Sequence, residues 1–302
     1  MNELVLNKIK TWKEFDALDQ DLKQELESIE NNEDALLDAF GSDIAFGTGG
    51  LRGILGVGTN RMNIYVVRKT TLGFYNYMAK KYSDLATRGV AIAYDCRRNS
   101  YLFAKTAAEV IASQGAKVYI FSSLRSTPEL SFAVRHLQCA GGIMITASHN
   151  PKEYNGYKVY GNDGCQITQA VAKEISQEIC AVGEYVLQMA AEFEDYRNWG
   201  KIQYISEIQV DNFCEEILSY GFCGERKSDL GGTLKVVYSP LNGAGKLCMM
   251  KVLHAKGIKD IHIVEEQSEP DGNFPTCPYP NPEDDKAMEL GIKLCEEMKA
   301  DI

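Results

Sequence analysis

The residues best suited to chemistry lie in the stretch Thr146-Ala147-Ser148-His149-Asn150-Pro151, which follows a short apolar run beginning at Gly141. A strand that runs into such a loop holds one hydroxyl group at the rim of a sheet. A free serine hydroxyl is a weak nucleophile and needs a base or a metal ion to activate it. Adjacent loop residues such as Ser148 and His149 do not usually face each other, so this pair alone does not predict a catalytic triad. On its own, the serine could simply cap a turn.

Lys158 lies ten residues after Ser148, at the end of the segment 154–158. Asn155-Gly156 within this segment is a typical hairpin signal, and we predict a turn there. Strand alternation then places Lys158 on the face opposite Tyr157. A lysine near a phosphoryl group would neutralise charge during its transfer, and a partly desolvated lysine could also act as general base or acid. The alternative is an ordinary solvated lysine on a strand.

A glycine-rich stretch, Thr48-Gly49-Gly50-Leu51-Arg52-Gly53, is the second candidate site. Glycines allow backbone N–H groups to approach an anion closely, and a guanidinium such as that of Arg52 can bind a phosphate through two hydrogen bonds. The spacing is not that of a dinucleotide-binding motif. The alternative is an ordinary flexible loop.

A third polar stretch, Asp95-Cys96-Arg97-Arg98-Asn99-Ser100, follows a predicted strand and opens a predicted helix. Ligands of α/β domains bind at this end of the strands. Ser100 is interpreted as the N-cap of the helix. Ser126-Thr127-Pro128 is interpreted as an architectural helix start, since proline is favoured in the first turn.

The composition indicates a soluble globular protein. A chain of 302 residues is long for one domain, so two are expected. The net charge of −10 argues against broad binding to nucleic acid. No apolar run is long enough for a membrane span, and the first residues do not resemble a signal peptide. The nine cysteines form no C-x-x-C pair, which favours a reducing, cytoplasmic location.

Strand and helix patterns alternate along the chain, which predicts α/β layers around a mixed sheet. A helical arm is expected over residues 1–40, one domain over 41–205 and a second over 206–302. Strands are predicted at 90–94, 117–121, 141–145, 235–238 and 261–264, and helices at 100–114, 127–137, 168–190, 243–255 and from the Pro-rich loop 269–282 to Lys299. The last three residues resemble the start of another strand, so we expect an N-terminal piece of a longer protein whose second domain is truncated.

The loop that contains Ser148, between the predicted strand 141–145 and the segment 154–158, is called the serine loop below. Together, the serine loop, the Asn-Gly-Tyr-Lys segment and the glycine-rich stretch resemble the α-D-phosphohexomutases, the phosphoglucomutase and phosphomannomutase family. The stretch 46–63 and the arm are most similar to the phosphoglucomutase/phosphopentomutase branch. The resemblance runs from about Phe46 to Ile302 and implies three-layer α/β/α domains. Loops at 240–246 and 270–282 match segments of the family's second domain, and we interpret both as turn structure.

The resemblance assigns roles to residues of this chain. It implies that Ser148 carries a phosphoryl group and passes it to and from a sugar phosphate. Arg52 and Lys158 are then candidates for proton handling, and His149 for orienting the phosphate. The implied substrate- or phosphate-binding residues are Thr48, Gly49, Arg52, Asp95, Arg97 and Asn150.

The family also implies partners for this site. Mg²⁺ would bind the phosphate of Ser148, with its other ligands on an Asp-rich loop beyond the end of this chain. Glucose 1,6-bisphosphate would act as activator, and the two remaining domains of the parent chain would supply the sugar-reading and distal phosphate sites. Conversion of a sugar 1-phosphate to a sugar 6-phosphate is therefore expected, with glucose as the favoured sugar, while the isolated chain is expected to be inactive.

Three other readings stay open at this stage. The parent protein could be a phosphopentomutase of the same family. It could be a non-catalytic binding protein on this fold, in which case Ser148 need not be phosphorylated. A serine hydrolase is the third reading, which predicts labelling by a fluorophosphonate, but no G-x-S-x-G motif supports it. The sequence does not decide which sugar phosphate is bound, or the oligomeric state.

Overall fold

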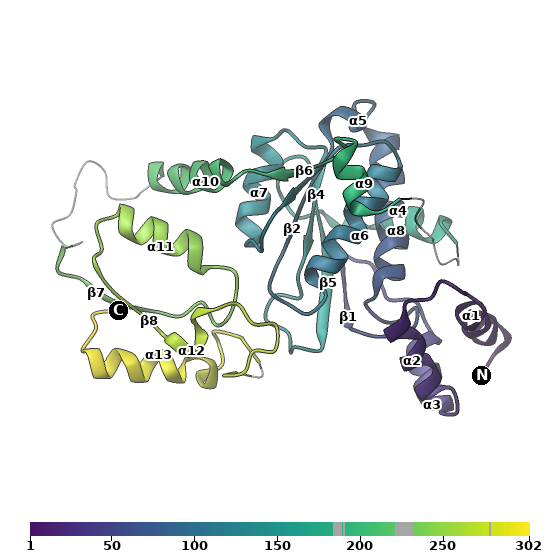
Figure 1. Cartoon of the computed structure of the whole chain (residues 1–302), viewed down its shortest axis with the longest axis horizontal. Helices are drawn as coiled ribbons and strands as arrows, with labels where there is room; N and C mark the ends of the chain where they lie inside the picture. Colours follow the sequence, from purple (N-terminus) through teal and green to yellow (C-terminus); the bar gives the residue numbers. More distant parts are fainter. Residues whose placement is uncertain (184–188, 190, 221–231, 278) are drawn as a thin grey trace.

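The computed structural model describes residues 1–183, 189, 191–220, 232–277 and 279–302. A six-stranded sheet forms the centre of its larger part, in the order β1-β5-β4-β2-β3-β6 (Figure 1). The strands span Leu51–Ile54 (β1), Val90–Tyr94 (β2), Val118–Phe121 (β3), Gly141–Ile145 (β4), Tyr154–Tyr160 (β5) and Ile202–Ile205 (β6). β5 pairs antiparallel with β1 and β4, whereas β4, β2, β3 and β6 run parallel. The predicted mixed sheet is therefore confirmed.

Helices cover both faces of this sheet. Val90 and Ile92 of β2 contribute to the core under α4, α6, α8 and α9, and the alternate residues Ala91 and Ala93 contribute to the core under α7 and α10. The helices span Ile64–Lys81 (α4), Leu85–Arg88 (α5), Ser100–Ser113 (α6), Thr127–His136 (α7), Gln169–Ala181 (α8), Phe193–Asn198 (α9) and Glu207–Ser219 (α10). Every residue of β2 is buried, as expected for a parallel strand covered on both sides. The predicted α/β/α layering is present.

The turn predicted at Asn155-Gly156 is wrong, because both residues lie inside β5. The buried Asn155 amide donates to the Arg98 carbonyl (2.9 Å) and to Ser100 Oγ (3.0 Å). Gly156 is needed for close packing, since an added Cβ would lie 2.6 Å from the Thr146 carbonyl oxygen. Long-range contacts therefore determine this segment, and its local turn preference does not.

Two helix boundaries also differ from the prediction. Ser100 is the first residue of α6, and the N-cap is Asn99, with φ of 63°. Helix α8 ends at Ala181, although the pattern predicted a helix to residue 190. Residues 184–188 and 190 lie outside the described residues. The predicted start of α7 is confirmed, because Ser126 caps it in a capping box with Glu129.

Gly50 closes the turn before β1, with φ of +77°, where side chains are strained. An added Cβ would lie 1.9 Å from the Tyr157 carbonyl oxygen. We expect Gly50→Ala to lower the free energy of unfolding by about 2 kcal/mol or more, because backbone strain adds to displacement of β5. Gly49→Ala is the matched control, because a Cβ added at Gly49 would have no other atom of the neighbouring structure within 4 Å. Urea denaturation compares them, and equal stabilities would contradict the argument.

The N-terminal segment forms three helices, where one or two were expected. They span Glu3–Lys13 (α1), Gln20–Ile29 (α2) and Glu33–Phe40 (α3). Trp12 packs edge-on against Phe40 and against Tyr65 of α4, with ring centroids 5.6 and 5.2 Å apart. The expected arm is therefore helical, and it packs on the body of the protein.

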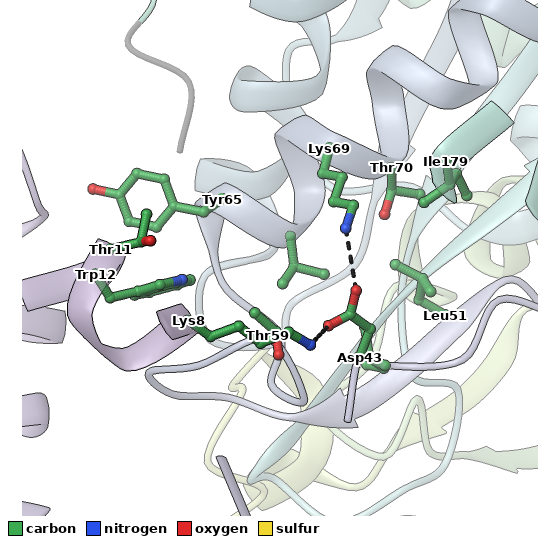
Figure 2. Close-up of a pocket in the computed structure, with 12 residues that line it drawn as sticks. Lys8, Thr11, Trp12, Asp43, Leu51, Thr59, Tyr65, Lys69, Thr70 and Ile179 are labelled. Carbon is green, nitrogen blue, oxygen red and sulfur yellow. Dashed lines mark hydrogen bonds and ion pairs between the residues drawn. The ribbon is translucent and has the colours of Figure 1, made fainter. Parts of the chain in front are cut away.

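Asp43 joins the arm to the body. It accepts hydrogen bonds from Lys8 of α1 (2.6 Å) and from Lys69 of α4 (3.1 Å), beside a small cavity of about 70 Å³ (Figure 2). Burial alone would raise the pKa of Asp43, but the two ammonium groups together hold the pKa below its usual value. These ion pairs fix the position of Asp43, which lies shortly before the glycine-rich stretch in the sequence.

A second α/β unit follows α10. Its strands Lys235–Tyr238 (β7) and Asp260–Ile263 (β8) pair in parallel, with the helices Lys246–Ala255 (α11) and Asp285–Met298 (α13) on either side and the short α12 (Glu265–Ser268) after β8 (Figure 1). The segment 300–302 is not assigned as a strand. It does bond to β7, because Asp301 N donates to the Lys235 carbonyl (2.9 Å) and Val237 N donates to the Ile302 carbonyl (2.8 Å). None of the helices within the described ranges combines the length and apolar character needed to cross a membrane.

Candidate active site

Ser148 lies exposed on the loop after β4, in a left-handed backbone conformation with φ of +57°. This conformation costs energy for a residue other than glycine and occurs often at functional sites. The Ser148 N–H donates to Thr146 Oγ1 (2.9 Å). Contrary to expectation, the Ser148 hydroxyl and the neighbouring His149 do face each other, with Oγ 3.4 Å from Nδ1. No carboxylate among the described residues bonds His149, so the pair lacks the acid of a hydrolase triad.

Arg97 binds the backbone of this loop. Its Nη2 donates to the carbonyls of Ser148 (2.7 Å) and Asn150 (2.6 Å), and its Nη1 donates to those of Pro151 (3.0 Å) and Tyr154 (3.1 Å). The Arg97 side chain is fully buried. Arg97 was predicted to bind phosphate, but these four donors bond the protein backbone. We therefore expect it to position the serine loop.

Asp95 also contacts residues that stabilise the loop. Its two carboxylate oxygens accept hydrogen bonds from Thr146 Oγ1 (2.6 Å) and Ser100 Oγ (2.7 Å), and Oδ2 lies 3.5 Å from Arg97 Nε. Burial raises the pKa of Asp95, while these hydroxyls and the Arg97 charge oppose that rise. Because Thr146 bonds both Asp95 and the Ser148 N–H, Asp95 acts on the loop through Thr146.

Arg52 approaches the loop from β1. Its Nη1 donates to Asn150 Oδ1 (2.7 Å), and the side chain is exposed. Arg52 pairs with Gly156 across β1 and β5, so Lys158 is its diagonal neighbour on the same face of the sheet. The structure therefore brings Arg52, Asn150 and Lys158 to the side of the sheet where the serine loop begins.

Lys158 is half-buried on β5, where it pairs with Met144 of β4. Tyr157 lies on the other face in the core, as the alternation predicted. Burial lowers the pKa of the Lys158 ammonium, and the nearby Arg52 charge lowers it further. No hydrogen bond joins this ammonium to another residue in the described ranges. Such a lysine can exchange a proton more readily than a solvated one.

Thr48 and Gly49 do not join this group. They lie at the tip of a tight turn in which Gly47 and Gly50 exchange backbone hydrogen bonds of 3.1 and 2.8 Å. The Thr48 carbonyl accepts from Gln166, which bridges to the far end of β5 from the serine loop. Their predicted contact with phosphate thus has no support from this arrangement.

A cleft of about 320 Å³ opens beside Ser148. One wall comes from the end of β4, the serine loop, the turn after β2 and the start of α7, and the other comes from the second unit. The latter contributes Pro240, Leu241, Gly243, Ala244, Phe274, Pro280 and Pro282. His149 meets Tyr279 edge-on, with ring centroids 6.0 Å apart. The sequence alone led to the interpretation of both loops in this wall as turns. Their Pro- and Gly-rich composition could have indicated that they closely approach another segment of the chain.

No group of three or more His, Cys, Asp or Glu within the described ranges could hold a metal ion. The described residues therefore do not form a complete Mg²⁺ site.

Comparison with known proteins identifies the arrangement. Residues 43–185 match the model of phosphoglucomutase/phosphomannomutase alpha/beta/alpha domain I, and residues 211–302 match that of domain II. The chain belongs to the phosphoglucomutase/phosphomannomutase family. The serine loop, Arg52, Arg97 and Lys158 all lie in domain I, and the opposite wall of the cleft lies in domain II.

Relatives in this family include a human phosphopentomutase, 36% identical over 90% of this chain and 45% of its own length. A phosphoglucomutase of Staphylococcus haemolyticus is 37% identical over 87% of this chain and 46% of its own length. A phosphoglucomutase/phosphomannomutase family protein from Burkholderia thailandensis shares the fold, with a TM-score of 0.64, 20% identity and coverage of 84% of this chain and 50% of its own. The chain thus spans about half the length of the curated relatives it matches.

The lowered pKa of Lys158 predicts a stability effect. The unfolded chain binds more protons than the folded chain at pH values between the lowered pKa and the usual one, so stability rises with pH across that window. Below the window the charged Lys158 costs stability. We expect Lys158→Met to stabilise the protein at neutral pH by less than about 1 kcal/mol, because solvent screens a half-buried group. Denaturation at pH 7 tests this against the exposed Lys152→Met, and a loss of stability specific to Lys158→Met would contradict it.

Proposed function

We propose that this chain forms the phosphoserine half of a phosphosugar mutase, which interconverts a sugar 1-phosphate and a sugar 6-phosphate. The observation that carries the proposal is the exposed Ser148 hydroxyl, held in a strained conformation on a loop that a buried arginine clamps at the mouth of a cleft. Rigid presentation of one group is what transfer of a phosphoryl group requires.

In the proposed reaction, the bond between phosphorus and Ser148 Oγ breaks as a sugar hydroxyl bonds to phosphorus. The proton of that hydroxyl passes to Lys158, whose pKa is lowered by burial, and the leaving Ser148 Oγ takes a proton from solvent, to which it is exposed, and becomes a hydroxyl. Arg52 and Asn150 flank the transferred phosphate, and His149 contacts the serine oxygen. The bisphosphate intermediate then reorients and transfers its other phosphate to Ser148, which regenerates the phosphorylated enzyme.

Glucose phosphate is the proposed substrate, and a pentose phosphate, which would be interconverted between its 1- and 5-phosphates, is the second candidate. The similarity to both a phosphoglucomutase and a phosphopentomutase supports keeping both sugars. Mg²⁺, which the family generally requires, and glucose 1,6-bisphosphate as activator belong to the same proposal. So do a cytoplasmic location and the need for two further domains.

The test is conversion of glucose 1-phosphate and of ribose 1-phosphate by the full-length protein, with Mg²⁺ and the matching bisphosphate. We expect turnover of at least one sugar, loss of turnover in Ser148→Ala, and loss on adding EDTA. Absence of turnover with both sugars, and with mannose and glucosamine 1-phosphates, would favour the non-catalytic binding protein. The chain of 302 residues alone is expected to turn over negligibly.

A further inference from the structure

Arg97, the clamp of the serine loop, has one face that its hydrogen bonds do not use. Its Nη donors lie in the guanidinium plane and bond three carbonyls of the loop and that of Tyr154 at the start of β5. The ring of Phe274, from domain II, lies over the guanidinium, with Cζ 5.1 Å from the ring centroid. An aromatic ring in this position attracts the cation and excludes water, which strengthens hydrogen bonds made in the plane.

The backbone around Phe274 is shaped to place this ring. Phe274 has φ of +47°, in the left-handed region that is costly for a bulky residue, and its side chain is buried. The turn is closed by hydrogen bonds from Phe274 N to the Asp271 carbonyl (3.1 Å) and from Asn273 N to Asp271 Oδ1 (2.8 Å). Such strain persists only where the surroundings fix it.

Domain II also touches the backbone that carries Arg97. A Cβ on Gly272 would lie 2.6 Å from the Cys96 carbonyl oxygen and 2.8 Å from Arg98 N, so only glycine allows this approach. Cys96 Sγ donates to the Asn242 carbonyl (3.1 Å) from a second loop of domain II. The turn 95–98 is thus packed between the serine loop and domain II.

We propose that Phe274 and Gly272 are positioning residues for the phosphoserine loop, acting through Arg97. In this arrangement domain II does more than form a wall of the cleft: it fixes the conformation in which Ser148 is presented. The importance of that conformation for phosphoryl transfer rests on the proposed function, whereas the mechanical coupling does not.

Hydrogen–deuterium exchange of this chain, without substrate, tests the coupling. The amides of Thr146, Ser148 and Asn150 are hydrogen-bonded and should be protected. We expect Phe274→Leu to speed their exchange about tenfold, as loss of a desolvated cation–π contact would. Phe274→Tyr, which keeps the aromatic face, should restore protection. Phe213→Leu is the matched control, because that ring packs on Phe132 in α7 and is not stacked on Arg97.

Unchanged exchange of the serine loop in Phe274→Leu would overturn the proposal, and so would an equal rise throughout the chain. If Phe274→Leu does not fold, Gly272→Ala provides the second variant, with the same expected local rise. In the full-length protein, Phe274→Leu should lower kcat about tenfold with KM unchanged, and an effect on KM alone would count against the proposal. Because exchange is read without catalysis, a protein that proves inactive as a mutase would still show the coupling.

Discussion

Lys158→Met in the full-length protein is expected to lower kcat for phosphoryl transfer by about 10²–10⁴-fold, the usual contribution of a positioned acid or base. Burial and the Arg52 charge lower the pKa of this lysine, so more of it is neutral and able to accept a proton near physiological pH. The exposed Lys152→Met, in the serine loop itself, is the matched control and should retain activity. A fall of less than about threefold in Lys158→Met would remove Lys158 from the mechanism.

The pH profile adds a second readout for the same residue. If Lys158 accepts the proton, the rate should climb as pH rises toward its lowered pKa, because the neutral amine is the reactive form. Lys158→Arg keeps the charge but cannot lose it, so that limb should disappear. A limb that survives in Lys158→Arg would assign the proton transfer to another group.

Arg97→Met is expected to lower the free energy of unfolding by about 3–5 kcal/mol, since it removes a buried cation and leaves its partners uncompensated. Four backbone carbonyls in and just after the loop would lose their donor, and Asp95 would lose the charge beside it. The measurement is the urea midpoint of the chain, compared with Arg98→Met.

Arg98 is exposed next to Arg97, so its substitution should change stability by no more than about 0.5 kcal/mol. Equal effects of the two substitutions would mean that the clamp contributes little. A large loss in Arg97→Met with an unchanged Arg98→Met would locate the stability in the contacts beneath the serine loop.

Much of the fold could be predicted because its signals are local. A few residues are enough to predict the apolar strands β2 and β4, and the same holds for the helix start at Ser126-Thr127-Pro128. The motifs that contain Ser148 and Lys158 are also local, and they carry the family resemblance. Helix α4 was not predicted, although Asn63 caps it by accepting hydrogen bonds from two backbone N–H groups.

Contacts between distant segments could not be predicted in this way. Asn155-Gly156 carries a strong turn signal, yet the approach of β1 and β4 on either side places it inside a strand. The family resemblance implied that Arg97 binds phosphate, and only the fold shows that four backbone carbonyls use its donors. The role of Phe274 depends on domain II meeting a turn that lies 177 residues earlier in the chain.

The central claim is that Ser148 carries the phosphoryl group, and peptide mapping by mass spectrometry tests it most directly. The full-length protein is incubated with glucose 1,6-bisphosphate and Mg²⁺, alongside Ser148→Ala and the neighbouring His149→Ala. We predict one phosphate in the peptide that contains Ser148, retained in His149→Ala and absent from Ser148→Ala. Active enzyme with an unmodified Ser148, or phosphate that persists in Ser148→Ala, would contradict the account.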